Sequence, residues 1–393
     1  MTKSKTTIIV GGFLGLIHAG GAVWDYIQYP LGFYLMEYDV YYVEDTRIFP
    51  IYTDNWNNSI PTVKRLKKIM DSFGLNDRWI YRDETTQTIY GKSEKEYKEI
   101  CKRAEVFLNV SCANVIREEY SQIPVRILLD TDPMFTQIQI ESGQSFTSKT
   151  SSLYELSNWH THHFTFGENI NGKDCFIPKT PFKWQVTRQP VCIDYWGNCR
   201  KPADIAPMTT LMNWKAGKPL SYNGQTWGQK DRTFPIIVGL PTHCNNENFE
   251  VAVNQTGAEK DAEGIVKLGE NGWNVVSSEN ASGSHSIYQS FIFKSKAEIS
   301  VAKETYVKAK TGWFSCRSAC YLAAGRPVVT QDTGWSYYYP CGKGLFAFTN
   351  QEEAIEAINK ISKDWDVQSK AAIEISHAYF DHNIVLKNIL ESV

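Results

Sequence analysis

The stretch that decides the fold is residues 311–334, with the sequence TGWFSCRSACYLAAGRPVVTQDTG. It reads as a loop with Gly312, a helix that begins near Ser315 and stops at Gly325, and a strand that starts at Pro327. The N-terminus of a helix presents unpaired N–H groups and a partial positive charge, so it binds phosphate well. The order of loop, helix and strand therefore indicates one unit of a parallel α/β sheet with a candidate anion site.

Polar side chains in the same stretch extend that candidate anion site. Arg317 and the hydroxyls of Ser315 and Ser318 add hydrogen-bond donors near the start of the helix. Local chemistry alone supports two readings equally: a phosphate cradle, or an ordinary loop–helix–strand connection that carries a surface arginine.

The rest of the chain repeats this alternation of strands and helices. Residues 6–10 form a β-branched run that meets Gly11 and Gly12, and a helical stretch and a second strand follow, which is the start of a parallel sheet. Residues 175–189 are rich in Pro, Lys and Thr without a clear period, and we place the domain junction there. We expect the first lobe to end on a strand at 164–167 and the second to begin on one at 191–195. The predicted units are residues 1–183, 184–370 and a helical tail, 371–393.

Composition excludes several classes of protein. The 393 residues carry 41 basic and 43 acidic side chains, a formal charge of −2, which argues against binding to nucleic acid. No apolar run approaches the ~18–20 residues that a membrane span needs. The nine cysteines form no CxxC pair, so we expect a soluble protein of the reducing cytoplasm with no integral membrane segment. The 12 Trp, 21 Tyr and 19 Phe either fill cores or stack on sugar rings and bases.

Two segments together resemble a known family. Residues 311–334 resemble the donor site of glycosyltransferases with the two-lobed GT-B fold, and the glycine loop at 11–21 resembles their N-terminal loop. The likeness extends from residue 8 to about 390, including 188–190 and 228–231. The chain as a whole resembles a group of glycosyltransferases near the large retaining family of sucrose and mannosyl transferases. It implies two Rossmann-like lobes facing across a cleft, with a C-terminal helix crossing back to the first lobe.

The resemblance also implies an activity. The protein is expected to move a sugar from a nucleotide-diphosphate sugar, with UDP or GDP as the nucleotide, to a hydroxyl of a glycan or other acceptor, without cofactor or metal. The resemblance places the following residues against the donor: Gly11, Gly12, Gly312, Ser315, Arg317, Ser318, Asp332, Thr333 and Gly334. The sequence departs from the family at Cys316, where the family usually has an acidic residue.

Four residues are candidates for the chemistry itself. Arg317 and Lys303, which follows a short apolar strand, would stabilise charge on the departing diphosphate. His18 and Asp25 lie on the half that faces the acceptor. His18 takes the acceptor proton if the enzyme inverts, or hydrogen-bonds the transferred sugar if it retains. An exposed lysine and an ordinary helix histidine are the plain alternatives.

Other motifs keep rival interpretations open. Asp130 and Asp132 form a DxD pair, which holds a metal in the other glycosyltransferase architecture, GT-A. The glycine loop and the 311–334 segment outweigh it, so we predict no metal and assign both residues, with His163, to the acceptor side. A Rossmann oxidoreductase remains an alternative although the glycine loop is not GxGxxG. A non-catalytic nucleotide- or glycan-binding protein is another. The aromatic run 335–339 is a candidate stacking surface.

Overall fold

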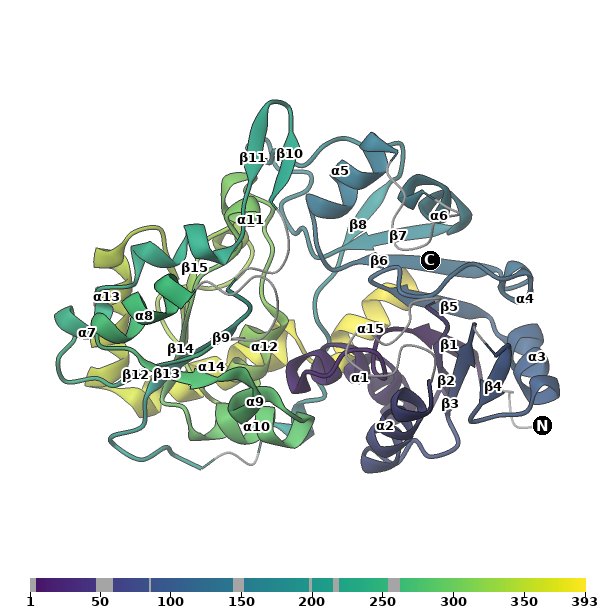
Figure 1. Cartoon of the computed structure of the whole chain (residues 1–393), viewed down its shortest axis with the longest axis horizontal. Coiled ribbons are helices and arrows are strands. Elements are labelled where there is room, and N and C mark those ends of the chain that lie inside the picture. Colours follow the sequence, from purple (N-terminus) through teal and green to yellow (C-terminus); the bar gives the residue numbers. More distant parts are fainter. Residues whose placement is uncertain are drawn as a thin grey trace.

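The computed structural model describes residues 5–46, 59–84, 86–143, 152–197, 200–214, 219–253 and 262–393. These residues form two α/β lobes that lie side by side, each built on a sheet of parallel strands flanked by helices (Figure 1). The predicted fold class, two Rossmann-like lobes, is therefore confirmed.

The first lobe contains an eight-stranded sheet with the order β4-β3-β2-β1-β5-β6-β7-β8, parallel except for β4. Its central strands, TIIVG and VFLNV, are mainly apolar and fully buried, as expected where helices cover a parallel sheet. The strands are β1 (Thr7–Gly11), β2 (Asp39–Glu44), β3 (Trp79–Asp83), β4 (Thr88–Tyr90), β5 (Val106–Val110), β6 (Val125–Asp130), β7 (His162–Thr165) and β8 (Trp184–Val186). The helices are α1 (Gly20–Leu35), α2 (Ile60–Ser72), α3 (Glu94–Arg103), α4 (Glu118–Ser121), α5 (Phe135–Ser142) and α6 (Leu153–Trp159).

The second lobe contains a six-stranded parallel sheet with the order β13-β12-β9-β14-β15-β16, and a separate hairpin, β10-β11. The strands are β9 (Met208–Met212), β10 (Leu220–Tyr222), β11 (Gln225–Trp227), β12 (Phe249–Val253), β13 (Asn274–Ser277), β14 (Ala297–Ser300), β15 (Val328–Gln331) and β16 (Leu345–Phe348). The helices are α7 (Leu240–His243), α8 (Ala262–Glu270), α9 (Ser278–Ser282), α10 (His285–Lys294), α11 (Glu304–Lys308), α12 (Cys316–Ala323), α13 (Gln351–Lys363), α14 (Trp365–Tyr379) and α15 (His382–Glu391).

Both sheets share one doubly wound strand order. Counting strands as they occur along each lobe, and leaving out β4, β8 and the separate hairpin β10-β11, the order is 3-2-1-4-5-6 in each. In such sheets ligands bind outside the carboxyl ends of the strands, where the order reverses. The places to search are therefore the loops after β1 and β5 in the first lobe and after β9 and β14 in the second.

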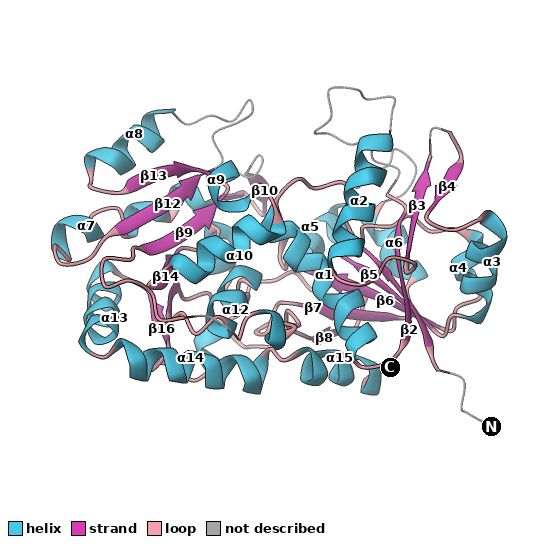
Figure 2. Ribbon diagram, turned by 90° about the horizontal axis from the view of Figure 1, so that it is seen from below, coloured by secondary structure: helices cyan, strands magenta, loops and turns pink. Residues whose placement is uncertain are grey.

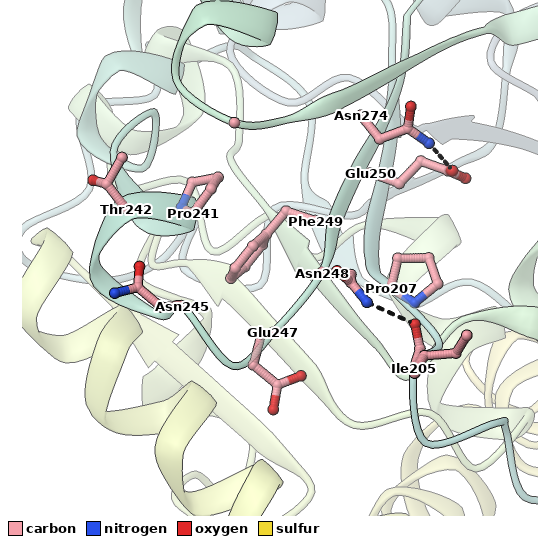
Figure 3. Close-up of a pocket in the computed structure, with 11 residues that line it drawn as sticks. Ile205, Pro207, Pro241, Thr242, Asn245, Glu247, Asn248, Phe249, Glu250 and Asn274 are labelled. Carbon is pink, nitrogen blue, oxygen red and sulfur yellow. Dashed lines mark hydrogen bonds between the residues drawn. The ribbon is translucent and has the colours of Figure 1, made fainter.

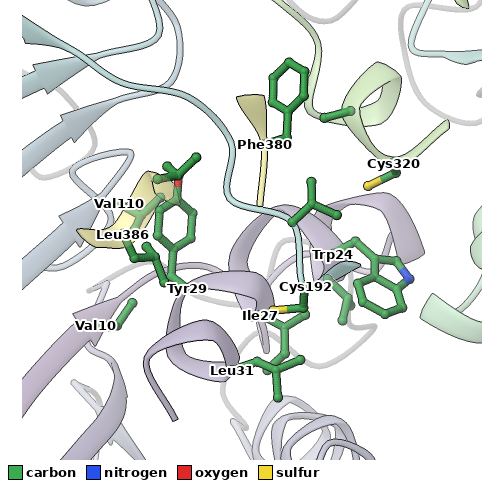
Figure 4. Packing of buried hydrophobic residues seen from close by; sticks show 14 of the residues in the cluster. Val10, Trp24, Ile27, Tyr29, Leu31, Val110, Cys192, Cys320, Phe380 and Leu386 are labelled. Carbon is green, nitrogen blue, oxygen red and sulfur yellow. The ribbon is translucent and has the colours of Figure 1, made fainter. Parts of the chain in front are cut away.

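The tail joins the two lobes. Helix α14 packs on α12 of the second lobe, and α15 packs on α1 of the first (Figure 2). Between them, the backbone N–H of Val191 donates to the Phe380 carbonyl at 2.7 Å. Figure 4 shows apolar side chains of α1 beside Cys192, Cys320 and Phe380, all within one buried cluster. The helix that crosses back to the first lobe is confirmed.

The predicted junction needs two corrections. Trp184 pairs with His163, so β8 belongs to the first sheet and the boundary at 183/184 lies too early. The strand expected at 191–195 is instead a single 3-10 turn, Ile193–Tyr195. The N–H of Cys192 donates to the Gln28 side chain at 3.0 Å. This apolar segment therefore packs on α1 and does not pair in a sheet. The boundary at 370/371 falls inside α14, and the break lies near Asp381 as expected.

Candidate active site

A cavity of roughly 380 Å³ lies between the lobes, where the carboxyl ends of the strands meet. The first lobe lines it with the loop after β1, with Ser111 and Cys112 after β5, and with residues 130–132 after β6. The second lobe contributes Leu220, Gln229 and Lys303. Ser111 and Cys112 both have positive φ angles, of 57° and 50°. Strained backbone of this kind gathers at functional sites, which agrees with the position at the switch point.

An ion pair links the two lobes at this cavity. Lys303 Nζ donates to Asp132 Oδ1 at 2.7 Å, and the Tyr306 hydroxyl donates to the same oxygen. Burial raises the pKa of Asp132, but the charge and hydrogen bond of Lys303 outweigh it and hold the pKa below its usual value. The structure thus brings together two predicted residues that lie 171 positions apart.

Lys230 adds a second lysine to this side of the cleft. Burial lowers its pKa well below the usual value, and the charges of Arg317 and Lys303 lower it further. Among the residues that the structure describes, its Nζ has no hydrogen-bond partner. Lys230 was not among the predicted site residues, although it lies in the 228–231 stretch that carried part of the resemblance.

Arg317 is anchored inside the second lobe. Its Nε donates to Glu298 Oε1 at 2.6 Å, and its Nη1 donates to the backbone carbonyl of Leu211. The Glu298 side chain is fully buried. Two of the guanidinium nitrogens are therefore used by the protein, which makes Arg317 a fixed charge whose Nη2 has no hydrogen-bond partner among the described residues.

Asp25 of the first lobe has a carboxyl group whose pKa is affected by burial and by the charges of Arg317 and Asp132. It lies on α1, and burial raises its pKa to about 7, with the charge of Arg317 lowering it and that of Asp132 raising it. His18 is exposed in the loop before α1, and burial and the charge of Arg65 lower its pKa. A group that changes charge near pH 7 suits proton transfer, so Asp25 fits that role better than His18.

The glycine loop is occupied by a carboxylate of the protein itself. The N–H groups of Gly15 and Leu16 donate to Glu44 at 2.7 and 2.8 Å. A Cβ on Gly11 would lie 2.7 Å from the Asn114 side chain, and one on Gly12 would lie 2.8 Å from the ring of Tyr26. These two glycines therefore permit close packing. Because Glu44 occupies the nest, the loop does not offer the pyrophosphate site of a dinucleotide-binding oxidoreductase.

The architecture matches solved glycosyltransferases along almost the whole chain. The Anabaena protein Alr3699/HepE, solved with UDP and glucose, matches with a TM-score of 0.58 at 12 % identity over 99 % of both chains. This chain has the GT-B fold. A glycosyltransferase from Rickettsia africae ESF-5 gives 0.53 at 12 % identity over 98 % of this chain and 97 % of that one. Sucrose-phosphate synthase from Thermosynechococcus elongatus gives 0.51 at 9 % identity over 98 % of each chain.

The match to GT-B structures lies in the fold rather than in the sequence. A scan against protein-family models and a search of curated proteins found no match. At 9–12 % identity the structural match establishes the architecture, and roles for individual residues rest on the geometry of this chain.

The predicted donor segment forms a turn at the GT-B cleft. The N–H of Gly312 donates to the Thr333 carbonyl at 2.8 Å, and the Thr333 hydroxyl donates to the Trp313 carbonyl at 2.7 Å. Gly312 has φ 76°, and a Cβ there would lie 2.4 Å from the Asn169 nitrogen of the first lobe. Asp332 accepts from the Gly334 N–H at 2.9 Å. These side chains and glycines build the turn.

No side chain among the described residues caps the N-terminus of α12. Ser315 is the N-cap residue, and its hydroxyl caps no backbone N–H. Ser318 is fully buried, and its Oγ has no partner among the described residues. Donor contacts from Ser315, Ser318 and the N–H groups of α12 therefore stay predictions that the geometry leaves open.

The three residues predicted for the acceptor side have different surroundings. Asp130 and Asp132 both line the cavity, but Asp130 is 2 % exposed and accepts hydrogen bonds from Thr136, Gln137 and Thr165. His163 does not line the cavity. Its Nε2 lies 2.8 Å from the Ser157 carbonyl, and its ring stacks on a neighbouring phenylalanine, because alternate residues of β7 face α6.

The aromatic run at 335–339 is mostly core rather than a stacking surface. Trp335 is 1 % exposed and Tyr339 is 5 % exposed, and both pack against Phe314. Tyr339 also donates to Glu168, which pairs with Arg188. Tyr337 is the member of the run that is mainly exposed. Aromatic side chains here hold the lobes together.

Two further observations concern a metal site and a membrane-spanning segment, neither of which the sequence predicts. Within the described part of the chain, no three His, Cys, Asp or Glu side chains gather in a way that would hold a metal ion. No helix in the same residues has the length and apolar character needed to cross a membrane.

A second hollow, of roughly 590 Å³, lies at the amino ends of β9, β12 and β13 (Figure 3). This is the edge of the sheet opposite to the one where such folds bind ligands. The charged residues that line it, Glu247 and Glu250, are acidic and would repel a diphosphate. The cleft between the lobes is therefore the candidate active site.

Proposed function

We propose that this protein transfers a sugar from a nucleotide-diphosphate sugar to a hydroxyl acceptor. The observation that carries the proposal is a group of three cations from separate segments of the second lobe: Lys303 lines the cleft cavity, and Lys230 lies close enough to Lys303 and Arg317 for their charges to lower its pKa. Such a group suits a diphosphate, whose negative charge grows as the sugar leaves. HepE, which shares the GT-B fold, was solved with UDP-glucose and with UDP and glucose, which supports UDP ahead of GDP.

The three cations have different parts in this proposal. Arg317 is fixed by Glu298 and supplies a permanent charge with one free nitrogen. Lys230 has no partner of its own among the described side chains and gains most from a bound anion. Lys303 keeps Asp132 as a partner, yet an ammonium group has three N–H donors, so it can hold Asp132 and a phosphate oxygen together.

The proposal also covers metal and cofactor dependence, cellular compartment and nucleic-acid binding. The lysines and the arginine supply the charge that a divalent metal would supply in the GT-A architecture, so we propose a reaction without metal or cofactor. The eight cysteines that the structure describes are all free. Free thiols are typical of a reducing compartment, which supports action in the cytoplasm. Nucleic acid is not a proposed partner because the chain has a near-neutral charge.

The first experiment is a donor panel. UDP-, GDP- and ADP-sugars are screened by thermal shift, and donors that bind are then followed by release of the nucleoside diphosphate. We expect a UDP-sugar to bind and turn over, with full activity after EDTA treatment. A panel in which no nucleotide sugar binds would overturn the proposed function, and activity that EDTA abolishes and Mn²⁺ restores would overturn its metal independence.

A variant of Lys230 tests the role of the cation group. Lys230→Met should lower kcat/KM for the donor by about 10²-fold, because a fixed charge at a developing anion contributes on that scale. Lys370→Met is the matched control, since Lys370 is 82 % exposed on α14 and is not among the residues that line the cavity. Equal activity of the two variants would remove Lys230 from the donor site.

A further inference from the structure

The walls of the cleft cavity on the first-lobe side are mainly apolar. Its lining includes Phe13, Ile17, Cys112, Leu128, Leu129, Phe135, Leu153 and, from the hairpin of the second lobe, Leu220. These side chains come from five separate segments, so the apolar character is a property of the assembled site. At about 30 Å³ for each non-hydrogen atom, 380 Å³ accommodates roughly a dozen atoms.

Several polar side chains in the same walls bond to one another. The Tyr26 hydroxyl donates to Ser111 Oγ at 3.1 Å, and Ser111 Oγ lies 2.7 Å from Thr131 Oγ1. Thr136 donates to Asp130 at 2.6 Å. A free sugar ring carries several hydroxyls that each need a partner when buried, and these groups are already satisfied.

Two amide side chains at the cavity, Gln139 and Gln229, have groups without a hydrogen-bond partner among the described residues, and that of Gln229 is buried. Gln229 lines the cavity and is 4 % exposed, and its Oε1 has no hydrogen-bond partner among the described residues. A buried acceptor without a partner indicates a donor supplied by a ligand. Gln229 is next in the chain to Lys230, so a hydroxyl on this oxygen lies near the lysines of the second lobe.

The hairpin β10-β11 covers the cavity. It extends from the second lobe toward α5 of the first (Figure 1), and the Tyr222 hydroxyl donates to Glu141 of α5 at 2.5 Å. Leu220 and Tyr222 pack on a buried cluster that contains Met134 and Ile138. An apolar group in the cavity is therefore enclosed by both lobes.

We propose that the acceptor presents its hydroxyl on an apolar body, an alkyl chain or an aryl ring, and that this body fills the cavity beneath the hairpin. The inference rests on the proposed function, because the hydroxyl beside Gln229 is the group that would receive the sugar. The apolar walls bind the body, and the buried, unpartnered Oε1 of Gln229 accepts from the hydroxyl. A glycan without an apolar group leaves the walls unfilled and several of its hydroxyls unpaired.

The test compares ligands that differ only in the apolar group. Binding of methyl, phenyl and octyl β-glucoside to the full chain is measured by calorimetry, with UDP present and absent. We expect phenyl or octyl glucoside to bind at least tenfold more tightly than methyl glucoside, since each buried methylene contributes about fourfold. A preference for phenyl identifies an aryl body, and a preference for octyl identifies a chain. Equal affinity of all three overturns the proposal.

Variants place the preference in this cavity. Leu220→Ser and Phe135→Ser change partly exposed wall residues and should each reduce the ratio of octyl or phenyl to methyl affinity by about tenfold. Ile205→Ser is the control, because Ile205 is 79 % exposed on the far side of the second lobe. A ratio that both wall variants leave unchanged overturns the assignment. The wild-type ratio stands as a separate criterion if either variant fails to fold.

The same measurements separate this proposal from the proposed function. If a UDP-sugar is turned over while the three glucosides bind equally, the apolar acceptor is wrong and the transferase stands. If the glucosides are discriminated but no nucleotide sugar binds, the cavity assignment stands as a ligand site and the transferase is wrong.

Discussion

The two sides of the cleft have the same strand order and opposite chemistry. The first-lobe side is mainly apolar, and two of its carboxylates are used internally: Glu44 holds the glycine loop, and Asp130 holds the loop after β6. The second lobe lines the same cavity with Lys303 and holds Lys230 and Arg317 close enough for the three charges to interact. The difference shows that a doubly wound sheet determines where a ligand binds, whereas the side chains on its loops determine which ligand it is.

The largest expected effect tests the fixed charge of the second lobe. Arg317→Met should reduce transfer by 10²-fold or more and destabilise the protein by about 3–5 kcal/mol, because it leaves Glu298 buried and unpaired. Activity and the melting temperature are measured together. The double variant Arg317→Met/Glu298→Gln is the control: it should recover much of the stability and none of the activity. Recovery of both would show that Arg317 acts only on the fold.

A smaller effect is expected at the ion pair between the two sides. Lys303→Met should raise the Kd for UDP by about tenfold, since a cation is lost from the diphosphate site. Asp132→Asn should act in the opposite direction and lower the Kd a few-fold, because Lys303 keeps its charge and loses its competing partner. Calorimetric titration with UDP measures both. If the two variants shift the Kd in the same direction, the pair holds the lobes together rather than binding the donor.

The smallest effect concerns pH and Asp25. Its pKa is raised to about 7 in the folded chain, so the carboxyl group holds its proton up to neutral pH. If the ionised form assists transfer, the rate should rise several-fold from pH 6 to 8, and Asp25→Asn should flatten that profile. His18→Gln is the control and should keep the rise. A profile that His18→Gln flattens instead would return the role to His18.

The same pKa has a consequence for stability. A carboxyl group whose pKa is raised on folding stabilises the folded state fully below its unfolded pKa, and this contribution is lost as the pH rises through about 4 to 7. Asp25→Asn should therefore raise the melting temperature at pH 8 and leave it nearly unchanged at pH 4. A gain at pH 4 as large as that at pH 8 would mean that the carboxylate is not the cause.

Several site residues were predictable from residue type and position after a strand. Lys303 follows β14 and Asp132 follows β6, and carboxyl ends of parallel strands meet ligands. Their contact with each other was not predictable, because they lie on different lobes. Lys230 was overlooked for a related reason: its local sequence resembles that of any surface lysine, and the desolvation and the charges of Arg317 and Lys303 that lower its pKa arise only in the folded chain.

The errors share a physical cause. His163 and Trp335 are residue types that bind substrates, but each faces the inside of a lobe, and which face a side chain takes depends on the packing of its element. The segment at 191–195 has the composition of a strand, yet contacts with α1 and with Phe380 hold it as a turn. Tertiary contacts outweigh local propensity in both cases.

The sequence by itself determined the alternation of strands and helices, the two α/β units and the loop–helix–strand segment at 311–334. Those features depend on apolar periodicity and turn residues within windows of about ten to twenty positions, which a chain carries locally. The tertiary structure alone decided that Glu44 fills the glycine loop, that Lys230 joins the cation group, and that Leu220 closes an apolar cavity. Each of these depends on side chains that meet only after segments tens to hundreds of residues apart have packed together.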